Sequence, residues 1–404
     1  MSVMDLTGLW NLRYVIFQQR DSEGIMGLLK GPVTATKYRV TGTVPDDFRN
    51  FVDERIKHFA FSGLSTGEAE KSIGWTSIDN ILDTDFSYAN YSIANYLIFS
   101  LRIDRKVVPT ALLKLKVLEA EKELLTQRNT EKIYKAERND LKDRIHLSLM
   151  NQTPPIPATF EVCWNVSEGW LLFGSLSEKV KEDFVDLFSR TFNLSLRPFV
   201  PWDMKYADPV TARRIASIFD AGLSGSDPIK GSEDAGGTDL SFLGRDFLTW
   251  LWFKSEERGG TVMVPDVGDV AMLFVRKLIL ESGEGPYSET VSCQGMHSNL
   301  TEGKSALRRG KKIKEARIKL AVGTDETEFS FKADTFQFQT LKFPPSFTME
   351  EDENDREGRI LERISIVEKG IGLMEQLFAF FLSKRTLPAW TSDEVPRMGK
   401  WMQE

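Results

Sequence analysis

The sequence predicts an α+β protein with mixed sheets, strand–helix–strand units, a long helical arm and a β-rich second lobe. Strand–helix–strand units flank residues 108–150, a stretch of strong helix formers without glycine. Dense runs typical of β-strands dominate from residue 262 onward. With 404 residues, 41% hydrophobic and 27% charged, the chain has the balance of a globular protein with two or three domains.

The first predicted domain covers residues 31–205 and begins with a strand at 34–42, where apolar and polar residues alternate. A helix follows, because apolar residues from Phe48 to Phe59 recur at helical spacing. The apolar run at 95–103 then completes one strand–helix–strand unit. Residues 1–30 precede this clear pattern, and we expect them to form a poorly ordered extension.

The predicted arm, residues 108–150, lies inside this domain. Pro109 occupies a first-turn position that tolerates proline, and the apolar residues then follow two separate stripes. The arm is therefore interpreted as two helices or as one helix broken near Asn129. Its charges have both signs, which fits a solvated connecting hairpin or a projecting arm that holds a partner.

A second unit follows the arm, with strands at 159–166 and 170–175 and a helix that begins after Ser177. A strand at 193–200 closes the domain. Residues 206–241 are predicted to be a linker or an insertion, because most of this segment is rich in Gly, Ser and Asp and poor in apolar residues.

The last two predicted parts are a helix with a β-rich lobe, residues 242–349, and a C-terminal helix with a tail, residues 350–404. The helix at 243–255 is apolar on most sides, which is typical of a buried helix, although its aromatic side chains could also stack on nucleic-acid bases. Gly and Asp at 323–327 predict a hairpin turn.

The strongest charge signal lies in residues 304–319, although the whole chain carries a net charge of −7. This basic run contains one acid, Glu315, and could neutralise phosphates without reading a base sequence. Alternatively, it could be a solvated hairpin edge protected by lysine. The candidate DNA-binding residues are Lys304, Arg308, Arg309, Lys311, Lys312, Lys314, Arg317 and Lys319.

No pattern of catalytic residues, metal ligands or cofactor-binding residues rises above background, so we expect no enzymatic activity and no cofactor. Asp83 and Asp85 could hold a metal in a nuclease, but one carboxylate pair is a weak signal. The segment 303–305 matches the end of a phosphate-binding loop, but Ser298 replaces its first glycine. Two cysteines and no long apolar run favour a reducing cytoplasm and no membrane partner.

The order of several short segments resembles the RdgC family of recombination-associated bacterial proteins, over roughly residues 31–382. These segments are Leu141-Lys142-Asp143, Leu147-Ser148-Leu149, the strands that contain Trp164 and Trp170, Leu196 with Pro198, Gly310-Lys311-Lys312, Lys319-Leu320-Ala321, Leu341-Lys342-Phe343 and Asp355-Arg356-Glu357.

The resemblance implies a ring-shaped homodimer that binds double-stranded DNA with little sequence preference through a positively charged hole. It also implies antagonism of RecA-dependent recombination and a nucleoid-associated, cytoplasmic protein. The implied dimer contact lies near Leu149, Met150, Pro154 and Pro155. The alternative function is a non-enzymatic scaffold that binds another protein and no DNA.

Overall fold

Antiparallel strand pairing organises both compact units of the chain, and helices pack on the sheets, which confirms the predicted α+β class. The computed structural model describes residues 27–28, 31–64, 70–86, 91–129, 132–220, 240–282, 289–296, 301–343 and 355–403. The β-rich unit comprises residues 1–39, 172–176 and 197–404, and the arm unit comprises residues 40–171 and 177–196. The predicted extension, residues 1–30, lies almost entirely outside the described residues.

The arm unit contains an antiparallel sheet in which β4 lies between β2 and β5. Its core is aromatic: Trp75 packs edge-on against Phe99 and Phe184, and its indole Nε1 donates a hydrogen bond to Thr191 Oγ1 over 2.8 Å. The elements of this unit are α2 (Phe48–His58), β2 (Lys71–Thr76), β3 (Ser92–Ile93), β4 (Tyr96–Arg105), α4 (Thr110–Arg128), α5 (Lys135–Gln152), β5 (Ile156–Asn165) and α6 (Glu178–Phe192).

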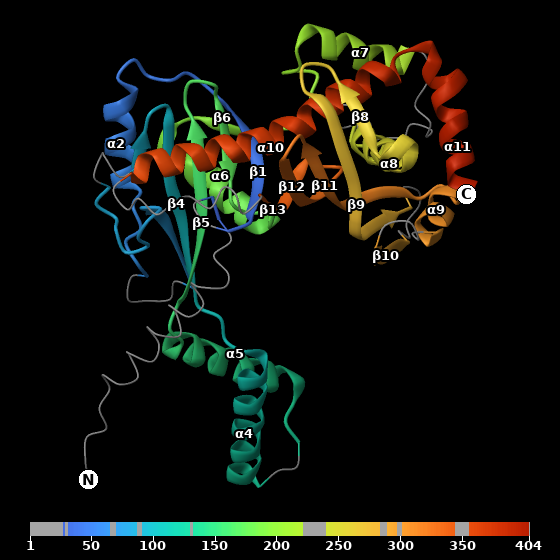
Figure 1. Ribbon diagram of the computed structural model, residues 1–404. Helices are drawn as coiled ribbons and strands as arrows, with labels where there is room; N and C mark the ends of the chain where they lie inside the picture. Colours follow the sequence, from blue (N-terminus) through green and yellow to red (C-terminus); the bar gives the residue numbers. More distant parts are fainter. Residues whose placement is uncertain are drawn as a thin grey trace. The chain divides into compact units, whose positions relative to one another are not determined.

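The arm consists of two helices, α4 and α5, inserted between β4 and β5 (Figure 1). The predicted break at Asn129 is confirmed, because this residue adopts a left-handed conformation, φ 51°, and ends α4. Glu121 on α4 is paired with Arg138 on α5, and this hydrogen bond lowers the pKa of the Glu121 carboxyl. The arm is therefore a helical hairpin fastened by charged groups.

The β-rich unit contains an antiparallel sheet with the strand order β10-β9-β11-β12-β13-β1, and β8 pairs with β9. The predicted hairpin is confirmed, since Val322 pairs with Asp325 across a turn that contains Gly323 at φ 60°. The strands are β1 (Val33–Thr41), β8 (Thr261–Val264), β9 (Gly268–Glu281), β10 (Thr290–Met296), β11 (Lys312–Val322), β12 (Asp325–Lys332) and β13 (Gln337–Lys342). Two short strands, β6 (Trp170–Phe173) and β7 (Ser195–Pro198), each contain residues of both units.

Helices cover one face of this sheet and bury its apolar side chains. Phe247 packs edge-on against Phe378 with ring centroids 5.3 Å apart, and Trp250 lies 5.6 Å from Phe381. The predicted burial of the aromatic helix is thus confirmed, because Trp250 and Trp252 are almost completely shielded from solvent. The helices are α7 (Pro209–Asp220), α8 (Phe242–Glu256), the 3-10 turn η1 (Glu257–Gly259), α9 (Thr301–Arg308), α10 (Arg356–Arg385), the π-helical turn η4 (Trp390–Glu394) and α11 (Val395–Gln403).

Two segments predicted to be a linker and a tail contain packed helices. Asp208 accepts the backbone N–H groups of Val210 and Thr211 and so caps α7, whose Ile215 and Ile218 are buried. Residues 209–220 of the predicted linker or insertion therefore form a packed helix and not a flexible connection. Residues 221–239 lie outside the described residues. In the tail, Trp401 packs edge-on against Trp252 at 5.0 Å.

The units also differ from the predicted domains, because each is discontinuous in sequence whereas the prediction used continuous segments. A strand that pairs with a distant part of the chain leaves no local sign of its partner, so the contribution of residues 33–39 to the β-rich unit was not visible. Among the described residues, no helix combines the length and the apolarity needed to cross a membrane.

The first prediction concerns Asp246 of α8, which lies 3.3 Å from Lys312 Nζ and 3.2 Å from Arg385 Nη2. The Arg385 side chain is only 6% exposed. Replacing Asp246 by Ala removes the carboxylate that pairs with this buried guanidinium, so we expect the free energy of unfolding to fall by about 3 kcal/mol. Urea denaturation measures this change.

The matched control is Glu119→Ala, which removes an exposed ion pair with Lys116 on α4. Exposed pairs of this kind contribute little, so the control is expected to change stability by at most about 0.5 kcal/mol. Equal effects of Asp246→Ala and Glu119→Ala would contradict the account of the β-rich core.

Candidate nucleic-acid interface

The basic run comprises the helix α9, a turn and the strand β11. Gly310 adopts φ 84°, which L-residues with side chains rarely adopt, and its N–H donates to the Leu307 carbonyl over 2.9 Å. The glycine ends the helix and lets the chain enter β11 at Lys312. Gly310 therefore separates the short helix from the strand that follows.

Most cations of the basic run are paired with carboxylates from distant parts of the sequence. Only one acid lies within the run, but carboxylates from β9, β12, α8 and the segment before β10 lie against its cations. The run therefore carries much less unpaired positive charge than its sequence indicates. The ion pairs are Lys304–Glu256 (2.9 Å), Lys311–Glu289 (2.9 Å), Lys312–Asp246 (3.3 Å), Lys314–Glu281 (2.7 Å), Arg317–Glu328 (2.6 Å) and Lys319–Glu326 (2.6 Å).

The side chains of Lys311 and Lys304 contact neighbouring elements of the fold. Lys311 is only 7% exposed, and its Nζ donates to both the carboxylate and the carbonyl oxygen of Glu289. This hydrogen bond is the main reason why the pKa of the Glu289 carboxyl is lowered. Lys304 lies 5.0 Å from the ring centre of Trp401. Both lysines thus hold neighbouring elements together.

Arg308 and Arg309 differ from these lysines, because both are exposed and neither forms an ion pair with a described carboxylate. Arg308 only donates to Ser305 Oγ, over 2.8 Å. In the part of the chain that the structure describes, they are the members of the basic run whose charge is most available to an external anion.

The open face of the sheet adds cations that the sequence analysis missed. Residues paired across antiparallel strands share a face, and Glu328 pairs with both Lys319 and Lys342. In a second row, Glu315 pairs with Lys332 and accepts a hydrogen bond from Lys277 over 2.8 Å.

Each row therefore has one acid between two cations, with Arg317 between the rows. We call this surface, Lys277, Arg317, Lys319, Lys332 and Lys342, the cationic sheet face. The period of two along β12, with Glu328, Ser330 and Lys332 at alternate positions, is the sequence signal that could have revealed it.

The proposed dimer residues have different exposures. Met150 is only 7% exposed and so belongs to the core of the arm, whereas Pro154 and Pro155 are exposed. Leu149 has intermediate exposure. The larger exposed apolar surface of the arm lies on α4, where Leu115 is 52% exposed and Leu118 is 59% exposed.

The weaker sequence signals for catalysis acquire structural explanations. The Asp83 carboxylate accepts the N–H of Asp85 over 3.1 Å and so stabilises a local turn. The described residues contain no cluster of three potential metal ligands. Residues 303–305 lie in the first turns of α9, and Ser298 lies outside the described residues.

Comparison with known proteins identifies a family for part of the chain. The family model described as "Putative exonuclease, RdgC" matches residues 34–209, which include the whole helical arm. No curated protein matches the sequence. The basic run and the cationic sheet face lie beyond the matched residues. Within the matched residues, the match agrees with the order of motifs noted along the sequence, and residues 34–209 are those of an RdgC-family protein.

Proposed function

We propose that the protein binds double-stranded DNA without sequence preference, encircles it as a homodimer and restrains RecA-dependent recombination. Arg308 and Arg309 add exposed charge at the end of α9, a helix on the covered side of the sheet. The observation that carries this proposal is the cationic sheet face. Two of its cations, Lys332 and Lys342, form no ion pair with a described residue, so they can meet phosphates without first breaking a contact.

The shape of the face favours contacts with phosphates over contacts with bases. Lys319, Arg317 and Lys277 project from paired strands, and a broad sheet surface does not enter a DNA groove as a single helix does. Contacts with phosphates position a protein on DNA but carry no sequence information. The intervening Glu315 and Glu328 limit the net charge, which fits reversible binding whose strength depends on salt.

The arm supplies the proposed closure of the ring. A twofold dimer uses the same patch on both subunits, so an exposed apolar stripe such as Leu115 and Leu118 can cover its own copy. The prolines at the base of the arm, Pro154 and Pro155, are exposed and are a second candidate for contact between subunits.

We further propose that the protein has no catalytic activity and acts by occupying DNA that RecA would otherwise use. Its place in the cell would then be the cytoplasm, in association with the nucleoid. The ion pairs of the basic run favour a second candidate function, a scaffold that binds proteins and no DNA. Direct measurement of DNA binding separates the two.

The second prediction tests the DNA contact with the double variant Arg308→Ala/Arg309→Ala. Loss of two phosphate contacts should weaken binding to every duplex sequence about equally and reduce the salt slope by up to about 1.8. Fluorescence anisotropy at several salt concentrations measures both quantities. Lys311 and Lys312 stay unchanged, because their ion pairs join structural elements.

The matched control is Arg213→Ala/Arg214→Ala, another adjacent arginine pair, located on α7. It removes the same charge from a helix and should leave the salt slope unchanged. Equal binding by the wild type and by Arg308→Ala/Arg309→Ala would remove the basic run from the interface. If the same mixtures shorten DNA when Mg²⁺ or Mn²⁺ is added, the non-enzymatic assignment is wrong.

The third prediction concerns the dimer. Sedimentation velocity at micromolar concentration should show a dimer for the wild type and a monomer for Leu115→Asp/Leu118→Asp, because carboxylates on the apolar stripe oppose its burial. Lys114→Asp/Lys122→Asp changes exposed residues of the same helix and should leave the dimer intact. A wild-type monomer at every concentration would eliminate the ring.

A further inference from the structure

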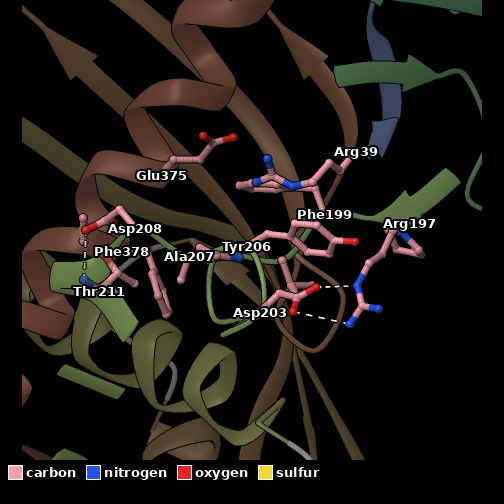
Figure 2. A pocket seen from close by; sticks show the side chains of 14 residues that line it. Arg39, Arg197, Phe199, Asp203, Tyr206, Ala207, Asp208, Thr211, Glu375 and Phe378 are labelled. Atoms are coloured by element: carbon pink, nitrogen blue, oxygen red, sulfur yellow. Dashed lines mark hydrogen bonds and ion pairs between the residues drawn. The ribbon is translucent and has the colours of Figure 1, made fainter. Parts of the chain in front are cut away.

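A pocket of about 230 Å³ lies in the β-rich unit, where β1, β7, α7 and α10 meet the segment 199–208 (Figure 2). Its lining combines charged side chains with an apolar wall. The pocket lies on the sheet face that α10 covers, because Lys37, two residues before Arg39 on β1, reaches Glu375 of α10 over 2.6 Å. The pocket is therefore separate from the cationic sheet face.

Arg39 is the unusual member of the lining. Its neighbour Lys37 is paired with Glu375, and Arg197 is paired with Asp203 through two hydrogen bonds. Arg39, which is half-buried, has no ion pair and no hydrogen-bonded carboxylate among the described residues. A partly desolvated guanidinium has strong donors to satisfy, so this position favours an external acceptor.

Aromatic rings hold this guanidinium in place. Its central carbon lies 5.1 Å from the centre of the Tyr206 ring and 6.0 Å from that of Phe199. Arg197 approaches Tyr206 as well, at 5.3 Å. Cation–π contact satisfies the face of a guanidinium but leaves the N–H groups at its edge available, and these groups match the two oxygens of a carboxylate or a phosphate.

The remaining lining residues are mostly apolar and could contact a small apolar group of a ligand. Phe199, Val200, Pro201, Phe378 and Ala379 line the pocket. The volume of about 230 Å³ is below the range of about 300–1,000 Å³ typical of drug-sized ligands, so the occupant is a compact group. Figure 2 shows Arg39, Arg197 and Tyr206 lying together beside this wall.

We propose that this pocket binds a compact ligand that carries one oxyanion, a carboxylate or a phosphate, on a small apolar or aromatic body. The edge of the Arg39 guanidinium donates to the oxyanion, and Phe199 and Phe378 contact the body. The carboxylates of the lining are already engaged, since Asp203 pairs with Arg197, Glu375 pairs with Lys37, and Asp208 caps α7. Arg39 is then the one lining cation without a described carboxylate partner, so the pocket suits a single anionic group rather than a polyanion. The site goes beyond DNA binding and does not depend on it.

The fourth prediction uses benzoate, phenyl phosphate and inorganic phosphate as anionic probes and benzyl alcohol as a neutral probe of similar size. Isothermal titration of the wild-type protein should show saturable binding of benzoate or phenyl phosphate and weaker binding of benzyl alcohol. Tighter binding of benzoate would indicate a carboxylate ligand, and tighter binding of phenyl phosphate would indicate a phosphate ligand. Inorganic phosphate should bind more weakly than phenyl phosphate, because it lacks the apolar body.

The variant Arg39→Met should weaken binding of the preferred anion by roughly tenfold or more, the effect of losing a charge-assisted hydrogen bond. Arg39→Lys keeps the charge but lacks the planar pair of donors, so it should also weaken binding. Arg144→Met, which removes an exposed arginine from α5, is the control and should bind as the wild type does.

Absence of saturable binding of both aromatic anions to the wild type overturns the proposal, as does equal binding of benzyl alcohol. Thermal melting monitors the fold of each variant. If Arg39→Met does not fold, Arg39→Lys decides, and wild-type affinity in this variant contradicts the assigned role of Arg39.

Discussion

The pairing of β11 with β9 and β12 places Ile313, Ala316 and Ile318 in the core beside α8 and leaves Arg317 and Lys319 on the opposite face. Lys314 is an extra residue in this strand, and the resulting bulge keeps the apolar side chains on one face although their spacing is irregular. A shift in pairing by one residue would bury cations and expose the core. Core packing and the position of the cationic sheet face therefore depend on the same register.

Charge must be considered in three dimensions in this protein. The sequence of the basic run contains one acid, yet ion pairs with Glu256, Glu281, Glu289 and other distant acids neutralise most of its cations. Conversely, Lys332 and Lys342 belong to no basic run but lie on the same face of the sheet as Lys319. The charge density of the sequence thus overstates the free positive charge of the basic run and gives no sign of the cationic sheet face. The reason is that strand pairing brings together residues far apart in sequence.

Patterns over short stretches of the sequence predicted most of the helices and turns that are determined by neighbouring residues. The break at Asn129, the buried aromatic helix and the hairpin at Gly323 followed from helix formers, apolar content and turn residues. The helix α7 was missed because the glycine-rich segment after it dominated the composition, even though Asp208 and Pro209 are a clear helix start. The pocket at Arg39 could not be predicted, since its lining comes from four elements that meet only in the fold.

The central claim is that the protein encircles DNA, and retention on DNA without ends tests it most directly. A closed ring can leave linear DNA by sliding off an end but cannot leave circular DNA in this way. After loading at low salt and a wash at high salt, which weakens contacts with phosphates, we predict greater retention on a relaxed circular plasmid than on the same plasmid cut once. Equal loss from the circular and the linear plasmid would contradict encirclement and indicate binding to the DNA surface.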